Sequence, residues 1–490
     1  DGDARMSPVN GALSAAPSYE VALDTRLGTD PRVAASVGVP GIALPAILRR
    51  AAAAGAPQVT GTVRRVVGLT IEAAGLRAPV GDIVRVLTGD LTTTGQGIDA
   101  EVVAVAPDHV TCMPLGAPGP GQGLRAGQPV LAIGRSQRIP VGIGLQGRVL
   151  DGLGRPIDGK GRVQATAWVP IDNPAPNPIE RERIDTPMGT GVRALDAMTP
   201  VGRGQRIGLF AGSGVGKSTL LSMVARGTTA DVNVIALIGE RGREVREFLE
   251  DDLGPEGLAR SVVVVATSDQ PPLVRLRAAM VATTIAEHFR DLGMDALLMM
   301  DSLTRFCMAQ REIGLSVGEP PATRGYPPST FALLPRLLER AGTSATGSIT
   351  GIYTVLVDGD DHNEPIADAA RSILDGHVVL DRDLATAGHF PSIDVLGSVS
   401  RVASRVTSRE QRGLATHVRR LMAARREAQD LVDVGAYVPG SNPLTDAAIG
   451  ARYDIDGFLR QDVDDRTSLD DAWGALAGVV ARNPVQEAAR

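Results

Sequence analysis

The sequence contains few cysteines, few aromatic residues and no long apolar segment. Cys112 and Cys307 are the two cysteines among 490 residues, and neither has a second cysteine or histidine at a metal-ligand spacing. This distribution argues against a disulfide framework and a structural zinc site, and it fits a reducing cytoplasm. The longest apolar runs, such as 262–266, are too short to span a bilayer. The N-terminus lacks the basic region and apolar core of an export signal.

Charge and aromatic content narrow the range of partners. The net charge of −6 gives the chain no overall electrostatic footprint for nucleic acid or for an anionic membrane. Aromatic residues make up 3% of the chain, so its core must be built from Ala, Val, Leu and Ile. Residues 58–133 contain no Trp, Tyr or Phe on which bases could stack. We therefore expect no nucleic-acid partner.

The residue pattern divides the chain into four parts, although length alone predicts about three domains. Residues 1–57 are rich in Ala, Gly, Pro and Ser and predict a flexible N-terminal segment. Residues 58–160 hold short β-branched runs between Gly- and Pro-containing turns, which predicts a small β-barrel. The runs are 62–66, 83–86, 100–105 and 129–133, followed by a strand and a tight glycine turn at 147–159.

The chain after the predicted barrel has a different residue pattern. Several prolines between 169 and 178 predict an extended connector. Between residues 161 and 404, apolar strands alternate with helices such as 273–292, which predicts an α/β domain with a parallel sheet covered on both faces. The pattern of residues 405–490 predicts a helical domain. Its apolar face is expected to carry Leu414, Val418, Leu421 and Met422, continued by Leu431 and Val432.

A glycine-rich turn between a strand and a helix dominates the α/β region. Residues 207–210 are apolar, and the helix is expected to begin near Lys217. Backbone N–H groups in such a turn cradle phosphate oxygens, and the helix N-terminus adds positive charge. Lys217 reaches the β- and γ-phosphates of a nucleotide, and the Ser218 hydroxyl holds Mg²⁺. Ala211 stands where the strict pattern has Gly. The predicted nucleotide-binding residues are Gly212, Ser213, Gly214, Val215, Gly216, Lys217, Ser218 and Thr219.

Two further strands end in carboxylates. Glu240 follows the apolar run 232–238. A carboxylate at the end of that strand can polarise an attacking water. Glu240 also begins a run of charged residues, so the alternative is a solvated surface carboxylate. Asp301 ends the apolar run 296–300 and would hold Mg²⁺ through water. Arg305 would lie one helical turn from Asp301, either facing the phosphates or pairing with Asp301.

Arg401 lies at the end of the α/β region. Hydrolysis needs positive charge on the transferring phosphoryl group, and an arginine supplied by a neighbouring subunit is worth about 10³–10⁵ in rate. Arg401 is our candidate for that finger, and the alternative is an ordinary surface arginine.

These motifs together resemble the rotary-ATPase α/β subunit family, and within it the ATPases of flagellar type III protein export. The resemblance covers about residues 58–450. The stretches that carry it are 211–219, 239–241, 298–306 and 391–401, with support from 309–315, 318–329 and 358–368. Ala211 also matches the export-ATPase form of the loop.

The resemblance implies a RecA-like P-loop core between an N-terminal β-barrel and a C-terminal helical domain. It implies ATP and Mg²⁺ as cofactors, Glu240 as the catalytic carboxylate and Asp301 as the second acid. It also implies γ-phosphate contacts from Arg241 and Arg305, and adenine stacking on Phe390.

The resemblance also implies partners and a location. It predicts a homohexamer that is cytoplasmic and peripheral at the membrane. A stator protein would bind the N-terminal segment, and the other partners would be export chaperones, their substrates and the export gate. The N-terminal segment is atypical of the family.

Four other functions share parts of this pattern. A non-flagellar secretion ATPase would share every catalytic residue, although 363–370 and 435–443 look more flagellar. A catalytic ATP synthase subunit is disfavoured because the C-terminal region lacks that family's acidic Asp-Glu-Leu-Ser-Glu-Glu-Asp stretch. A non-catalytic ring subunit usually lacks the acid that Glu240 supplies. A hexameric RNA translocase would need a basic, aromatic first domain.

Overall fold

The computed structural model describes residues 60–88, 97–116, 123–357 and 364–485. The predicted N-terminal segment 1–57 lies outside this range, as do residues 358–363 of the supporting stretch 358–368. Residues from Val59 onward belong to one compact unit. No described helix is long and apolar enough to cross a membrane.

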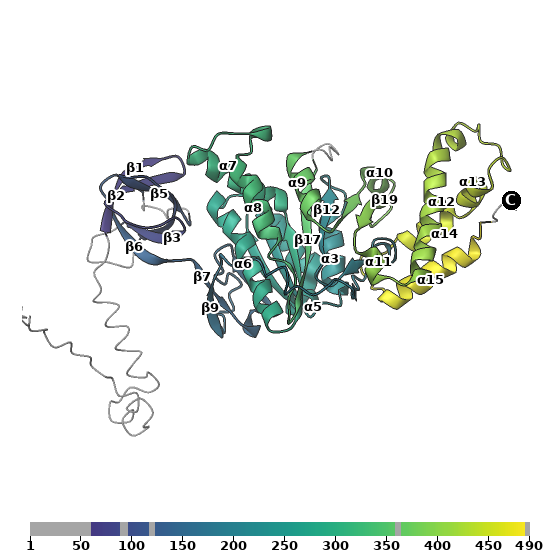
Figure 1. Cartoon of the computed structure of the whole chain (residues 1–490), viewed down its shortest axis with the longest axis horizontal. Coiled ribbons are helices and arrows are strands. Elements are labelled where there is room, and N and C mark those ends of the chain that lie inside the picture. Colours follow the sequence, from purple (N-terminus) through teal and green to yellow (C-terminus); the bar gives the residue numbers. More distant parts are fainter. Residues whose placement is uncertain (1–59, 89–96, 117–122, 358–363, 486–490) are drawn as a thin grey trace, which may run out of the picture. The chain divides into compact units, whose positions relative to one another are not determined.

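The first six strands close into a barrel in the order β1-β2-β5-β4-β3-β6 (Figure 1). All of the predicted runs between residues 62 and 133 lie in its strands. Inward-facing residues such as Val63, Val84 and Val102 fill a small aliphatic core without aromatic rings, as the composition requires. The strands are β1 (Thr60–Val67), β2 (Thr70–Ala74), β3 (Asp82–Leu87), β4 (Gly97–Val105), β5 (His109–Pro114) and β6 (Pro129–Ser136).

The barrel ends earlier than the sequence predicted. β8 (Arg148–Asp151) pairs in parallel with β14 (Ser261–Ala266), so it belongs to the central sheet and the expected boundary at residue 160 is wrong. β7 (Arg138–Val141) pairs with β9 (Ala167–Pro170), so the extended connector begins after Pro170 rather than at residue 169. A short β-branched run shows that a strand forms but not which sheet it joins, because pairing is non-local.

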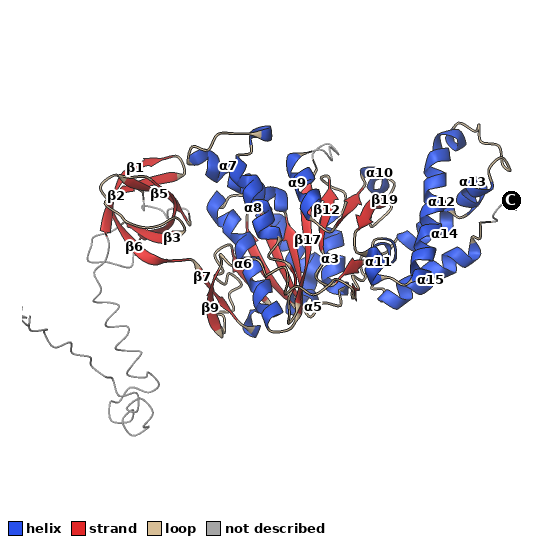
Figure 2. Ribbon diagram, in the orientation of Figure 1, coloured by secondary structure: helices blue, strands red, loops and turns tan. Residues whose placement is uncertain are grey.

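The central sheet confirms the predicted parallel α/β core. Its strand order is β19-β18-β12-β17-β15-β13-β14-β8, with only β19 antiparallel to its neighbour among these strands. Figure 2 shows these strands in red among the helices that cover them. The remaining strands are β10 (Pro187–Met188), β11 (Val201–Gly202), β12 (Arg206–Ala211), β13 (Val232–Ile238), β15 (Asp295–Asp301), β16 (Gly342–Thr343), β17 (Ser348–Leu356), β18 (Gly376–Leu380) and β19 (Ile393–Ser400).

Alternate residues of the buried strands face opposite layers. Val234 and Ala236 of β13 pack in one core with the helix α6, while Ile235 and Leu237 pack in another with α3. This two-sided burial explains why the strands read as continuous apolar runs. The helices of this region are α3 (Lys217–Gly227), α4 (Gly242–Glu247), α5 (Gly254–Ala259), α6 (Pro272–Asp291), α7 (Leu303–Ser316), α8 (Pro328–Leu338), α9 (Pro365–Ile373) and α10 (Arg382–Thr386), with the 3₁₀ helices η2 (Ile143–Leu145) and η5 (Thr323–Gly325) and the π-helices η3 (Ala194–Met198) and η4 (Phe248–Leu253).

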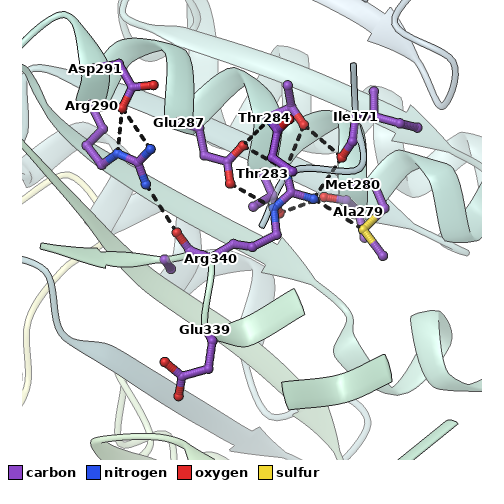
Figure 3. A network of polar contacts seen from close by, with 12 residues as sticks. Ile171, Ala279, Met280, Thr283, Thr284, Glu287, Arg290, Asp291, Glu339 and Arg340 are labelled. Carbon is purple, nitrogen blue, oxygen red and sulfur yellow. Dashed lines mark hydrogen bonds and ion pairs between the residues drawn. The ribbon is translucent and has the colours of Figure 1, made fainter. Parts of the chain in front are cut away.

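A buried arginine ties α6 to the connector after β9. Arg340 makes two 2.8 Å contacts with the carboxylate of Glu287 and donates to the carbonyl of Ile171 and the hydroxyl of Thr284 (Figure 3). Both charged side chains are almost fully buried. Each charge has several partners, which offset the cost of removing it from water, and these contacts join three segments.

The C-terminal part is helical, as predicted. Its helices are α11 (Ala403–Val406), α12 (Arg409–Asp433), α13 (Pro443–Gly450), α14 (Arg452–Leu459) and α15 (Leu469–Arg482). Ser408 and Gln411 form a capping box that starts α12. Val418 and Leu421 are buried as expected, but Leu431 is 51% exposed and Val432 38% exposed, so the apolar face does not continue to the end of α12. Its buried stripe is instead continued by Ala424 and Ala428.

Candidate active site

The phosphate-binding loop lies between β12 and α3. Gly214 and Gly216 have φ values of 78° and 87°, a backbone region that residues with a Cβ rarely adopt. The glycines are therefore required by the turn itself. Among the described residues, no side chain caps the start of α3, so the N–H groups of its first turn are in the arrangement that binds anions.

Two carboxylates converge on the lysine at the start of α3. Lys217 Nζ lies 2.5 Å from Asp301 Oδ1 and 3.5 Å from Glu240 Oε1. β12, β15 and β13 are parallel, so the segments that follow their carboxyl ends meet at one edge of the sheet. Burial alone would lower the pKa of Lys217, but Asp301 and Glu240 outweigh it and the pKa is raised. The lysine is therefore an ammonium in this cluster.

Asp301 is held by a second donor that the sequence analysis missed. The hydroxyl of Thr354 donates to Asp301 Oδ1 over 2.8 Å, and Thr354 is completely buried. Thr354 lies on β17, which separates β12 from β15 in the sheet. A polar residue inside the apolar run 349–356 was the available signal.

Glu240 follows β13 and is partly enclosed, with a side chain 19% exposed. Burial raises its pKa, the charge of Lys217 opposes that rise, and Asp301 and a hydrogen bond with Glu244 add to it. Glu240 therefore does not simply belong to the solvated charge run that follows it. It faces the lysine that the phosphate loop presents.

The structure brings Arg305 to the same place. Gly239 has a φ of 72°, and a Cβ there would lie 3.1 Å from Cβ and Cγ of Arg305. The stem of Arg305 thus packs directly beside the backbone that leads to Glu240. The Nε of Arg305 is buried and finds no hydrogen-bond partner among the described residues. Asp301 pairs with Lys217 rather than with Arg305.

Arg241 does not join the cluster. Its side chain is 75% exposed and pairs with Glu244 at 2.7 Å. It lies largely in solvent, and no ion pair or hydrogen bond among the described residues joins it to Lys217, so its position does not support the expected contact with the γ-phosphate.

Phe390 lies against the phosphate-binding loop. A Cβ on Gly216 would be 3.5 Å from its ring, and the ring is 46% exposed. The Ser392 hydroxyl donates to the carbonyl of Val215 over 2.6 Å, which fixes the segment to the loop. An exposed aromatic face is thereby presented next to the loop.

Arg401 lies at the opposite ends of the sheet strands from the phosphate-binding loop. Ser400 pairs with Gly376 at the start of β18, whereas the phosphate loop follows the carboxyl end of neighbouring β12. The Arg401 side chain is exposed, and its Nη2 donates to the carbonyl of Arg371 over 3.2 Å. The structure therefore does not bring Arg401 to Lys217 of the same chain.

Family models match two parts of the chain. Residues 191–400 match the nucleotide-binding domain of the ATP synthase alpha/beta family, and residues 407–478 match the C-terminal domain of the type III secretion ATPase EscN. These ranges contain every predicted site residue except Arg401, which lies one residue beyond the first range.

Curated relatives match almost end to end. The flagellum-specific ATP synthase of Bacillus subtilis (strain 168) is 51% identical, over 86% of this chain and 94% of its own length. The type 3 secretion system ATPase of Xanthomonas euvesicatoria is 50% identical, over 86% of this chain and 93% of its own length.

A solved structure agrees in fold. The assembled ATPase EscN of the enteropathogenic E. coli type III secretion system matches with a TM-score of 0.80 and 43% identity, covering 86% of this chain and 100% of that one. A second structure shows EscN in complex with its central stalk EscO. The chain therefore belongs to the ATP synthase alpha/beta family, in the branch of the flagellar and type III secretion ATPases.

Proposed function

We propose that this chain hydrolyses ATP to energise protein export through a flagellar type III apparatus. The observation that carries the proposal is the cluster of Lys217, Asp301 and Glu240 at the phosphate-binding loop. A lysine and two carboxylates at the end of parallel strands are the parts that phosphoryl transfer to water needs.

The chain's own groups divide the work. Loop amides and Lys217 bind the β- and γ-phosphates, so Lys217 exchanges its present contact with Asp301 for phosphate oxygens. Glu240 then orients a water towards the γ-phosphorus and accepts its proton. Arg305 is the cation proposed to contact the γ-phosphate, and its buried Nε without a partner among the described residues supports that role. The proposal assigns no phosphate contact to Arg241.

The donors present fit Mg²⁺. The hydroxyl of Ser218 and the carboxylate of Asp301 offer hard oxygen ligands, and Ser218 is exposed at the start of α3. No described group of three or more His, Cys, Asp or Glu side chains could hold a metal by itself. Mg²⁺ is typically held by one or two protein oxygens together with phosphates and water, so these residues suit an ion that arrives with the nucleotide. Bound there, it would neutralise charge on the phosphates.

Phe390 is proposed to stack on adenine. Its ring is half exposed beside Gly216, which puts an apolar face next to the predicted phosphate site. A phenylalanine supplies such stacking without a hydroxyl.

Arg401 is proposed to act on the nucleotide of a neighbouring copy. Because it lies at the opposite strand ends from its own phosphate loop, a ring of identical subunits is the simplest way to use it. The EscN relative was solved as an assembly, which supports a ring. We propose a homohexamer.

Partners are proposed by analogy with the same relatives. EscN binds its central stalk EscO. Here, exposed apolar side chains occur around the α12–α13 connection, among them Leu431, Val434 and Val438. They support binding of export chaperones or a stalk to the helical region. The proposed stator contact of the N-terminal segment lies outside the described residues, and the proposed place of action is the cytoplasmic side of the membrane at the export gate.

A non-flagellar secretion system is the second candidate, because identity to its ATPases is similar. Flagellar relatives reach 52% over 85% of this chain, and non-flagellar ones reach 52% over 70% of it. Deletion of the gene separates the two: loss of flagella supports the flagellar system, and loss of effector secretion with intact flagella supports the other.

Phosphate release by the purified chain tests the ATPase. Lys217→Ala is expected to abolish turnover, and Glu240→Gln to retain nucleotide binding while losing hydrolysis, because an amide accepts no proton. Specific activity should rise with protein concentration if the site is shared between subunits. Normal turnover by Lys217→Ala would refute the assignment.

A further inference from the structure

A buried glutamine helps to fasten the loop between α14 and α15 to the nucleotide-binding core. Gln461 is 5% exposed, and its side-chain amide is fully used. Oε1 accepts from the N–H of Arg193 over 2.9 Å, and Nε2 donates to the carbonyls of Gly191 over 2.7 Å and Asp465 over 3.0 Å. The side chain therefore fixes the loop both to the core and to itself.

The main chain of the same residue reaches the aromatic segment. The N–H of Gln461 donates to the carbonyl of Phe390 over 3.0 Å. On its other side, this segment contacts the phosphate loop through the Phe390 ring at Gly216 and through Ser392 at Val215. Phe390 is thus held between the phosphate loop and Gln461.

Further contacts fix the α14–α15 loop from the core side. The guanidinium of Arg193 donates to the carbonyl of Phe458 over 3.0 Å and to the hydroxyl of Thr467 over 3.3 Å. Arg226, in the helix that begins at the phosphate loop, donates to the carbonyl of Val463 over 2.6 Å. The position of the loop relative to Phe390 is therefore set by several independent bonds.

We propose that Gln461 is a positioning residue for base recognition, acting through Phe390. The proposal rests on the proposed function, in which Phe390 stacks on adenine. The Gln461 side chain anchors the loop whose main-chain N–H bonds to the carbonyl of Phe390, so loss of that side chain lets the ring move while the amides and Lys217 still grip the triphosphate. Displacement of α14 or α15 by a partner would change the affinity for the base by the same route.

The test separates base binding from triphosphate binding. Gln461→Met keeps the side-chain length and removes its hydrogen bonds. Gln429→Met is the matched control, because that amide bonds to Asp433 on the surface of α12. Dissociation constants for ATP and for inorganic tripolyphosphate are measured by calorimetry with the full chain, together with KM and kcat.

We expect Gln461→Met to weaken ATP binding and raise KM about three- to tenfold, with tripolyphosphate binding and kcat unchanged. The control should match wild type. In a Phe390→Ala background, Gln461→Met should have no further effect, because the two residues act on one contact. Arg193→Met releases the same loop from the core side and should give the same selective loss; it replaces Gln461→Met if that variant does not fold.

Three outcomes would refute the inference, and they overturn different statements. If Phe390→Ala selectively weakens ATP binding but Gln461→Met and Arg193→Met do not, the positioning role is wrong and the base site stands. If Phe390→Ala itself leaves ATP binding unchanged, the adenine contact fails and the inference fails with it. Equal loss of ATP and tripolyphosphate binding in Gln461→Met would show a general structural role and also refute the inference.

Discussion

The position of Arg401 allows its proposed role to be tested by mixing two inactive variants. Arg401→Ala keeps its own Lys217 cluster, and Lys217→Ala keeps its own Arg401. Each should be inactive alone, since an arginine finger is worth about 10³–10⁵ in rate. Arg401 follows β19 at the strand ends remote from its own phosphate loop, so the two groups are expected to meet only between copies.

The size of the rescue follows from chance pairing around a ring. At equal amounts, about a quarter of the sites combine an intact Lys217 with an intact Arg401 from the next subunit. Activity should therefore peak at equal mixing, at about a quarter of the wild-type value, and fall to zero at either pure variant.

A second mixture provides the control. Lys217 and Glu240 lie 3.5 Å apart in the same chain, so mixing Lys217→Ala with Glu240→Gln leaves every site incomplete. Phosphate release is measured after subunit exchange, which energy transfer between labelled subunits verifies. Verified exchange with no activity at any ratio of the Arg401→Ala mixture would refute a finger acting between subunits, and full activity of Arg401→Ala alone would refute any role.

Three other predictions follow from the same geometry. Thr354→Val keeps the shape of a buried side chain but removes its hydrogen bond to Asp301. Urea unfolding should show a free energy of unfolding lower by about 1–2 kcal/mol, and steady-state assays should show a lower kcat. An unchanged kcat would contradict a positioning role. Burial raises the pKa of Glu240, so its proton-accepting form should be lost as pH falls through a pKa above the usual carboxyl range. The value of kcat/KM should therefore decline at that pH. A decline only near about pH 4 would argue against Glu240 as the base. Arg340→Met should destabilise the fold by about 3–5 kcal/mol in urea unfolding, because Glu287 would keep a buried charge without its partner; the double variant with Glu287→Gln should recover part of that loss.

The sequence alone identified the elements whose signals are local. The strand, glycine turn and helix at the phosphate loop follow from residues adjacent in the chain, since positive φ at Gly214 and Gly216 admits little else. Buried parallel strands read as continuous apolar runs, so their carboxyl ends, and with them Glu240 and Asp301, could be placed at one edge. Four of the six barrel strands were found as short β-branched runs between Gly- and Pro-containing turns, whereas β2 and β5 were not identified.

Tertiary structure decided which of these residues meet. Whether β8 joins the barrel or the sheet depends on pairing with β14, more than a hundred residues later. The sequence offered Arg305 and Arg241 alike as contacts for the γ-phosphate, yet packing on Gly239 brings Arg305 to the cluster while Arg241 pairs with Glu244 in solvent. Thr354 and Gln461 carry no motif at all. Their roles exist only because strand order and domain contacts bring distant backbone together, and such contacts leave no short-range period in a sequence.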